Sequence, residues 1–576
     1  MKKKLSLAII TLSLFPLVIP GLMLAQQRQP GQSSAGSGSG TKPASGVTAP
    51  VRRAPHIRSA NPLAPIEDDF QEALKIVEEH YVDGGKLDYN SVFKSSITGM
   101  LRTLDPHSNY FDRQEFDELK TDQRSEYFGI GASIQNYIIG DDIDTFITAT
   151  FAGSPAGRAG LRFGDRIVAV DGVKMTGKQS IEVRDKIRGP RGSLVKITIE
   201  RAATRQIDTV QITRDVVPQP SIPDAYLIKP GVGYIDMTRG FNYSTTEELQ
   251  SALDELHAKG MTSLVLDLRN NPGGFLDQAL HVAELFLPNR DLILTQKGRY
   301  GDAEKQSGNP KPDLTPLVIL VNGSTASASE IVAGAMQDHD RALIVGKTSF
   351  GKGLVQSIIP LESGAGLTLT SAKYYTPSGR LIQRDYSNGG LYDYYTHGGT
   401  ISVDRKDPGA KPSGPERRTD TGRAVYGGGG IAPDESVEPR AISVFQRRLL
   451  SPIFSFSREV VNGRVAGVEA YKVQKPIDFD HTLQPTDYPA TEALFGAFKA
   501  YVTGQPALKV TAAQLDHNRA FIEIQLRFNI VTAAYGSVRA YRVLITGDDP
   551  QVAKAVGLLP RARDLAMSAM QVRGQQ

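Results

Sequence analysis

The chain contains no cysteine, which excludes disulfide bonds, thiol catalysis and thiolate metal sites. It also carries little net charge, +4 over 576 residues, so nothing in the composition points to nucleic acid as a partner. What remains is the composition of a soluble globular protein with a flexible part. The length predicts three or four domains.

The first 25 residues have the pattern of a signal peptide. Three lysines precede an apolar run from Leu5 to Leu24 that two prolines interrupt, and cleavage is predicted after Ala25. An uncleaved N-terminal membrane anchor is the alternative, because the run is close to a minimal membrane span. Either interpretation predicts export to the cell envelope or periplasm. Residues 26–65 are rich in Gln, Ser, Gly and Pro, which predicts a disordered linker.

The most informative stretch is NGSTASASEIVAGAMQD, at residues 322–338. It follows an apolar run at residues 316–321, which predicts a buried strand. Ser327 and Glu330 have the spacing of a capping box, so a helix is expected to begin near Ser327. A serine at such a turn can expose its hydroxyl, and the free N–H groups of the helix start can bind an oxyanion. The alternative is that these hydroxyls only cap the helix.

Lys352 lies between two glycines in the next segment, VGKTSFGKGLVQSII, at residues 345–359. A serine nucleophile needs a base, and a lysine can serve if burial keeps it neutral. Gln356 projects from the same face of an extended strand, so it could orient the lysine without adding charge. A solvated or phosphate-binding lysine is the alternative, but GKTSFGKG does not complete a P-loop, G-x-x-x-x-G-K-[ST].

These two segments together resemble the carboxyl-terminal processing proteases, or tail-specific proteases, a family of peptidases with a Ser–Lys dyad. The family's S-A-S-A-S-E pattern places the nucleophile on Ser327, with Thr325 in place of its first serine. Its F-G-K-G pattern places the base on Lys352 and the assisting glutamine on Gln356. The resemblance covers roughly residues 66–439. It implies that the reaction needs no metal or organic cofactor.

The turn LVLDLRNNPGG, at residues 264–274, matches the family's D-L-R-x-N-P-G-G pattern. The resemblance implies that this turn donates one N–H to the oxyanion hole, which we assign to Gly273, with Gly274 as the competing choice. The second donor is then the N–H of Ala328. Asp267 and Arg269 are interpreted as structural ions or turn caps.

Residues 121–215 change to short strands separated by glycine turns and resemble a protease-associated PDZ domain. Such domains add a bound peptide as a strand and hold its terminal carboxylate on backbone N–H groups. The glycines of the segment FGIGA allow the close backbone approach that this carboxylate nest needs. The predicted peptide-binding residues are Gly129, Ile130, Gly131, Val183, Ile187 and Arg188.

The other predicted parts are an N-terminal helical region at residues 66–120, a protease core at residues 216–440 and an extension at residues 441–576. In the helical region, LRTLDPHSNYF matches a family signature, and Asp105 and His107 are interpreted as structural because a proline between them marks a turn. The core has a βαβ order. Helices in the extension either make a subunit contact in a homo-oligomer or pack on the core.

The expected fold class is α/β and multidomain. It consists of an N-terminal helical segment, a PDZ domain inserted before an α/β, crotonase-like serine protease core, and a helical C-terminal extension. The expected function is that of an exported serine endopeptidase that cleaves protein or peptide substrates near or from accessible C-termini. The PDZ domain is expected to recruit or gate these substrates.

Two other function classes compete with this one. A non-catalytic PDZ scaffold has no need of Ser327, Lys352 and Gln356 together. A crotonase-like enzyme acting on thioesters is disfavoured by the PDZ domain and the export signal.

Overall fold

The computed structural model describes residues 63–123, 126–140, 142–386, 414–473 and 476–574. The predicted signal peptide and nearly all of the predicted linker lie outside these residues. The described chain divides into two compact units, residues 63–104 and residues 105 onward. In the described ranges, no helix is long and apolar enough to cross a membrane.

The smaller unit is helical. It contains α1 (Ala64–His80), a short 3₁₀ turn (Gly84–Lys86) and α2 (Tyr89–Arg102). The apolar residues Phe70, Leu74 and Val77 lie on α1, within the region predicted to be helical, and none of the residues of this helix is buried. The Asp88 side chain accepts the N–H of Asn90 and so caps the start of α2.

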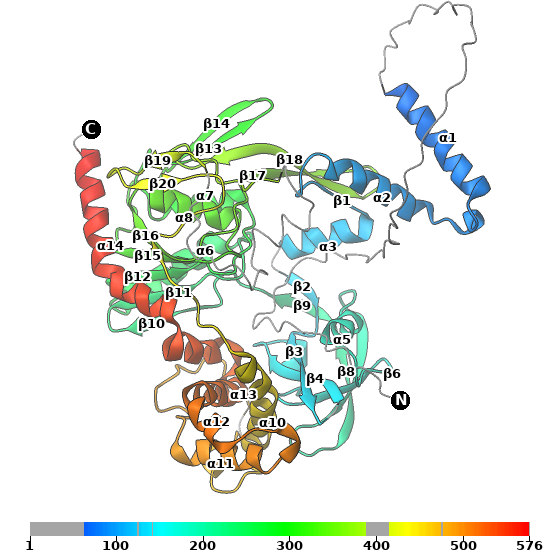
Figure 1. Ribbon diagram of the computed structural model, residues 1–576, viewed down its shortest axis with the longest axis vertical. Coiled ribbons are helices and arrows are strands. Elements are labelled where there is room, and N and C mark those ends of the chain that lie inside the picture. Colours follow the sequence, from blue (N-terminus) through cyan, green and yellow to red (C-terminus); the bar gives the residue numbers. More distant parts are fainter. Residues whose placement is uncertain (1–62, 124–125, 141, 387–413, 474–475, 575–576) are drawn as a thin grey trace, which may run out of the picture. The chain divides into compact units, whose positions relative to one another are not determined.

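The region predicted as the protease core contains a six-stranded sheet in the order β10-β11-β12-β15-β16-β21. Figure 1 labels the first five of these strands. Strand β10 runs antiparallel to β11, and the other neighbours are parallel, which confirms the predicted βαβ order. The strands are β10 (Asp224–Lys229), β11 (Val232–Asp236), β12 (Ser263–Asp267), β15 (Leu317–Val321), β16 (Ala342–Gly346) and β21 (Glu435–Ser436).

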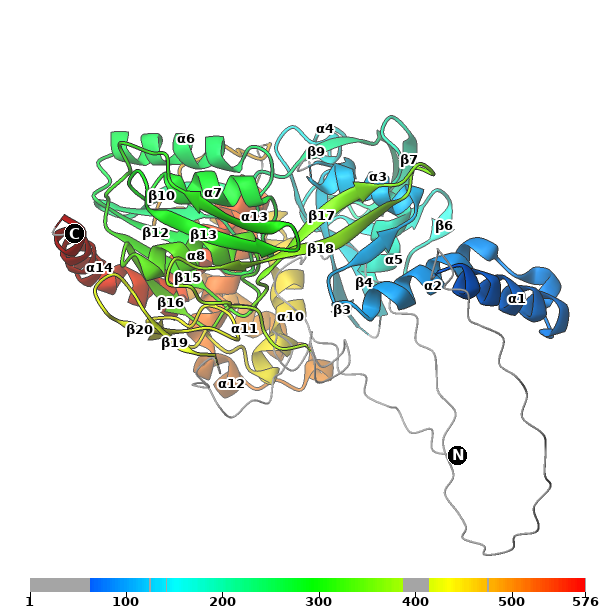
Figure 2. The same ribbon diagram turned by 90° about the horizontal axis from the view of Figure 1, so that it is seen from above.

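Alternate residues of these strands face two helical layers. On one face, Leu317 and Ile319 pack with α6 (Thr245–Ala258), α7 (Leu276–Glu284) and α8 (Ala328–Asp338). On the other face, Val318 and Leu320 pack against α14 (Pro550–Gly574). Figures 1 and 2 show α14, in red, on the side of the sheet away from α6 and α7. Parallel strands covered on both faces are apolar throughout, as LVILV in β15 is.

The last helix of the extension therefore belongs to the core. For this helix the structure shows packing on the core, which is one of the two alternatives predicted for the extension. Apolar side chains of α14, including Val552, Leu558 and Leu559, fill one layer of it.

We expect Leu559→Ala to lower the free energy of unfolding by about 2–5 kcal/mol, because the side chain is only 5% exposed and its removal leaves a cavity against the sheet. Urea denaturation of the purified variant measures this loss. Arg563→Ala on an exposed position of the same helix is the control and should change stability by less than about 0.5 kcal/mol. Equal effects of the two substitutions would contradict the packing role of α14.

A second sheet contains the segment that follows Lys352 in the sequence. Its strands are β1 (Asn109–Phe111), β18 (Gly366–Tyr375), β13 (Leu292–Gly298) and β14 (Gly301–Gln306), with β17 (Leu354–Pro360) also paired to β18. Asn109 of β1 pairs with Thr368 of β18. This pairing brings the LDPHS segment to the same sheet as Gln356.

The predicted PDZ region forms a sheet in the order β3-β4-β5-β7-β8, with β6 paired to β5. The same region contains helices α4 (Pro155–Arg158) and α5 (Ser180–Ile187). Strand β2 (Glu126–Gly129) pairs with β9 (Asp215–Pro218) in a separate two-stranded sheet. The strands of this sheet are β3 (Ala132–Ile139), β4 (Asp142–Thr150), β5 (Arg166–Val170), β6 (Val173–Lys174), β7 (Leu194–Glu200) and β8 (Ile207–Thr213).

The extension begins with a group of helices that packs on the PDZ region. Phe454 stacks on Tyr137 of β3 with ring centroids 3.7 Å apart, and Arg458 pairs with Glu200 at 3.0 Å. Residues 520–531 are helical and belong to α13. The helices are α10 (Val444–Val461), α11 (Glu492–Thr503), α12 (Ala512–His517) and α13 (Arg519–Asp548).

Candidate active site

Ser327 is the N-cap of α8, at the end of the turn that follows β15, as the sequence predicts. Its backbone has φ 56° and ψ −116°, in a region that non-glycine residues rarely adopt. Such strain persists only where the surroundings impose it, and it is frequent at catalytic turns. This backbone conformation makes Ser327 a candidate catalytic residue in addition to its position as a helix cap.

Glu330 ties the turn of Ser327 to the loop of Lys352. Its carboxylate is 0% exposed and accepts the backbone N–H groups of Ser327 at 2.9 Å, Gly351 at 2.6 Å and Lys352 at 2.8 Å, together with the hydroxyl of Ser349. Burial raises the pKa of this carboxyl, and the hydrogen bonds oppose the rise. The sequence identified Glu330 only by its capping-box spacing, which does not reveal the bonds to residues 349–352.

Tyr374 of β18 joins the same two residues from the other side. Its hydroxyl, on a side chain only 1% exposed, lies 3.1 Å from the carbonyl oxygen of Ser327 and 2.9 Å from that of Lys352. Ser327 and Lys352 are therefore each held by Glu330 at the N–H and by Tyr374 at the carbonyl. Nothing in the sequence pattern distinguishes Tyr374 from its neighbours on the strand.

We expect Tyr374→Phe to lower kcat about 10-fold with KM nearly unchanged, because the ring still packs while the two carbonyls lose their shared donor. Tyr375→Phe is the matched control, since adjacent residues of a strand point to opposite faces. Steady-state cleavage of a fluorogenic peptide measures both. Equal kcat values for the two variants would contradict the positioning role of Tyr374.

Burial lowers the pKa of Lys352 to about 8, and the negative charges of Glu330 and Asp105 limit this shift. The amine is therefore readily deprotonated, as a base must be. No hydrogen bond joins its Nζ to Oγ of Ser327 among the residues that the structure describes. Hydrogen bonds between catalytic groups often form only when substrate is bound.

In the described part of the chain, no hydrogen bond joins Gln356 to the amine of Lys352. Its Nε2 donates to Oγ1 of Thr370 at 3.2 Å. The N–H of Thr370 donates to Oγ of Ser108 at 3.1 Å, and that hydroxyl donates to Asp105 at 2.7 Å. The structure therefore links Gln356 to the LDPHS segment, whereas the sequence predicted a link to Lys352.

Asp105 and His107 lie closer to the site than the sequence suggested. The Asp105 carboxylate holds its own turn by accepting the N–H groups of His107 at 2.7 Å and Ser108 at 2.9 Å, which fits the structural interpretation. Burial and the charge of Lys352 lower the pKa of His107 to about 3, so its imidazole is neutral. Both residues are therefore part of the surroundings of Lys352.

The turn at residues 268–274 lies against the nucleophile turn. A Cβ added to Gly273 would come within 2.8 Å of Cβ of Ser327 and 2.9 Å of the nitrogen of Ala328, so only glycine fits there. The N–H of Gly273 is, however, donated to Oδ1 of Asn271 at 2.9 Å.

This bond competes with the predicted role of Gly273 as an oxyanion donor. An Asx turn at Asn271 captures the N–H that we assigned to the oxyanion hole. Within the described part of the chain, the N–H groups of Gly274 and Ala328 have no acceptor. Of the two predicted choices, Gly274 is therefore the one whose N–H remains free in the described residues.

The predicted peptide-binding residues of the PDZ region are placed as follows. Gly129 pairs with Asp215 in the β2–β9 ladder, and Gly131 has a φ of 72° that glycine adopts freely. Ile130, Val183 and Ile187 are buried together in the core of this region rather than exposed along a groove. Arg188 follows α5 as its exposed C-cap.

Across the described ranges, no group of three or more His, Cys, Asp or Glu side chains could hold a metal ion. The functional groups gathered here are thus a serine, a lysine with a lowered pKa and free backbone N–H groups. Such a set suits nucleophilic acyl transfer.

Known proteins resemble the chain over these same regions. A model of peptidase family S41 matches residues 231–391, and a PDZ domain model matches residues 146–201. The carboxy-terminal-processing protease of Bartonella bacilliformis is 38% identical over 305 residues, which are 51% of this chain and 68% of that protein. The carboxy-terminal processing protease CtpA of Bacillus subtilis is 32% identical over 319 residues, which are 55% of this chain and 66% of that protein.

Among solved structures, the photosystem II D1 C-terminal processing protease is 28% identical, covering 65% of this chain and 93% of that chain with a TM-score of 0.35. The sequence relatives carry the assignment, because one at 38% identity is matched over 68% of its length. The chain therefore belongs to the carboxy-terminal processing proteases of peptidase family S41 and is a serine-type peptidase that carries a PDZ domain.

Proposed function

We propose that the protein is an exported endopeptidase in which Ser327 is the nucleophile and Lys352 the general base. Glu330 and Tyr374 each form hydrogen bonds to the backbones of both Ser327 and Lys352, and we call this arrangement the clamp. It holds Ser327 and Lys352 close together and is the observation that carries this proposal. The lowered pKa of Lys352 supports its role as the base.

In the proposed reaction, Oγ of Ser327 attacks the scissile carbonyl carbon while its proton passes to the neutral Nζ of Lys352. The N–H groups of Gly274 and Ala328 stabilise the oxyanion. When the C–N bond breaks, Lys352 returns the proton to the leaving amine. Water then hydrolyses the acyl-enzyme, again with Lys352 as the base. Gln356 supports this arrangement through Thr370.

Labelling with a fluorophosphonate tests the proposal. The reagent should phosphonylate Oγ of Ser327 with loss of fluoride, and mass spectrometry of the digest locates the label. The labelling rate should rise with pH and should be negligible in Lys352→Arg. A label on another serine, or equal labelling of that variant, would refute the Ser–Lys assignment.

Export is supported by three lysines that precede the apolar run at residues 5–24. Cleavage of this segment would release the protein into the periplasm, and retention would anchor it to the membrane. Mass spectrometry of the N-terminus of the mature protein, together with cell fractionation, distinguishes the two.

We propose that the PDZ domain selects substrates by their free C-termini. Amidation of a peptide substrate should then raise its KM several-fold, because a charged acceptor for the backbone N–H groups is lost. The kcat should change little, since the PDZ residues lie outside the Ser327 turn. Initial rates on paired free-acid and amidated peptides measure this. Identical KM values would show that the domain does not recognise the carboxylate.

A further inference from the structure

The start of α14 contacts the oxyanion turn of residues 268–274 through Arg269. The guanidinium pairs with Asp267 through Nε at 2.9 Å, and its Nη1 lies 2.8 Å from Oδ2 of Asp549 and 2.9 Å from Oε1 of Gln551. Gln551 is 1% exposed and Asp267 0% exposed. Asp267 is additionally hydrogen-bonded by Tyr234 at 2.7 Å. Arg269 thus joins the end of β12 to the extension by a buried network, in which any misplaced partner is costly.

The residues after Arg269 connect this network to the nucleophile. Asn270 has a φ of 61° and exchanges hydrogen bonds with the side chain of Asn322, at 3.0 Å and 2.9 Å. The carbonyl of Asn271 accepts the N–H of Ala326 at 2.9 Å and the hydroxyl of Ser329 at 3.2 Å. The placement of this turn therefore decides where the N–H of Gly274 lies relative to Ser327.

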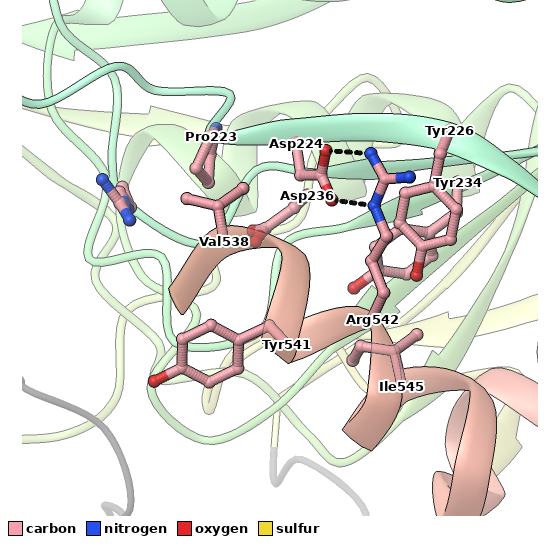
Figure 3. Close-up of a pocket in the computed structure, with 10 residues that line it drawn as sticks. Pro223, Asp224, Tyr226, Tyr234, Asp236, Val538, Tyr541, Arg542 and Ile545 are labelled. Carbon is pink, nitrogen blue, oxygen red and sulfur yellow. Dashed lines mark hydrogen bonds and ion pairs between the residues drawn. The ribbon is translucent and has the colours of Figure 1, made fainter. Parts of the chain in front are cut away.

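The extension is itself fixed to the core next to this point. Arg542 and Arg539 of α13 pair with Asp224 of β10 at 2.6 Å and 2.7 Å. Figure 3 shows the Arg542–Asp224 pair beside the ring of Tyr226, over which the guanidinium lies at 4.2 Å. Directly after α13, Oδ1 of Asp549 accepts the N–H groups of Gln551 and Val552 and caps α14. The Asp549 carboxylate therefore binds the start of α14 through Oδ1 and Arg269 through Oδ2.

We propose that Asp549 and Gln551 are positioning residues for catalysis, which act through Arg269 to hold the oxyanion turn against Ser327. The C-terminal extension would then complete the active site as well as cover the sheet. This inference rests on the proposed function, since it requires that residues 268–274 supply an oxyanion donor.

The test compares Asp549→Asn with wild type in the full-length protein. Asparagine retains an oxygen that can cap α14, so the helix start is preserved while the ionic bond to Arg269 is lost. We expect kcat for a fluorogenic peptide to fall about 10- to 100-fold with KM within about 2-fold of wild type. Affinity for a peptide aldehyde of the same sequence should fall by a similar factor, because its hemiacetal oxyanion occupies the same donors.

Asp291→Asn is the matched control. Asp291 pairs with Arg573 at the other end of α14, with comparable burial, but that pair does not contact the oxyanion turn. It should change kcat and aldehyde affinity by less than about 2-fold. If Asp549→Asn does not fold, Gln551→Met replaces it with the same readouts, because Gln551 contacts the same guanidinium.

The outcomes separate this inference from the proposed function. Wild-type kcat and aldehyde affinity in a folded Asp549→Asn or Gln551→Met would overturn the inference, as would losses equal to those of Asp291→Asn. If instead the aldehyde failed to inhibit wild type, or Ser327→Ala remained active, the proposed function would fail and the inference with it.

Discussion

Ser327→Ala is expected to lower kcat at least about 10⁴-fold, because no acyl-enzyme can form without the hydroxyl. The fold should be retained. The bonds that hold this residue in place run from its backbone N–H to Glu330 and from Tyr374 to its carbonyl, and alanine keeps both. The free energy of unfolding should change by less than about 1 kcal/mol.

Cleavage of an unstructured protein and of a fluorogenic peptide measures the loss, with circular dichroism as the test of folding. Ser324→Ala, in the same turn, is the control and should retain nearly full activity. A folded Ser327→Ala enzyme with more than about one hundredth of wild-type kcat would exclude Ser327 as the nucleophile.

Lys352→Arg is expected to abolish turnover at every pH between 6 and 10, since a guanidinium stays protonated throughout this range. In the wild type, kcat/KM should rise with pH and level off above about 8, the pKa to which burial lowers this amine. At pH 7 only about a tenth of the enzyme would carry a neutral lysine. Turnover of the folded arginine variant, or a wild-type profile without this ionisation, would assign the base to another residue.

The same ionisation affects stability. The pKa of Lys352 is about 8 in the folded protein, below the ordinary value of 10.5. Between these two values the unfolded chain binds more protons than the folded chain, so stability rises with pH across this window. Urea denaturation at pH 7.5 and pH 10 should show a larger gain for wild type than for Lys352→Met. Equal gains would mean that the amine is not desolvated.

The sequence alone determined the parts of this protein that depend on nearby residues. The capping-box spacing of Ser327 and Glu330 predicted that a helix begins near Ser327, and α8 begins there. The segment that contains Lys352 was expected to continue as a strand, and β17 follows it. The sequence likewise predicted helices in the extension, and the structure contains them. Each of these patterns depends on residues that are close together in the sequence, so it can be recognised without the tertiary structure.

Only the tertiary structure decided how these parts meet. The clamp of Glu330 and Tyr374, the approach of Asp105 to Lys352 and the capture of the Gly273 N–H by Asn271 all depend on geometry that spacing does not specify. Gln356 lies on β17, where the sequence predicted a strand, yet its hydrogen-bond partner is Thr370, because the pairing of β17 with β18 sets which side chains are adjacent.

One long-range contact shows the physical reason most clearly. Arg269 and Asp549 are 280 positions apart, and neither has a local pattern that names the other. Their meeting follows from the burial of α14 on the apolar face of the sheet, which is driven by non-directional hydrophobic packing. That packing brings α14 to the sheet, and the buried ion pair then sets where its first residues lie against the oxyanion turn.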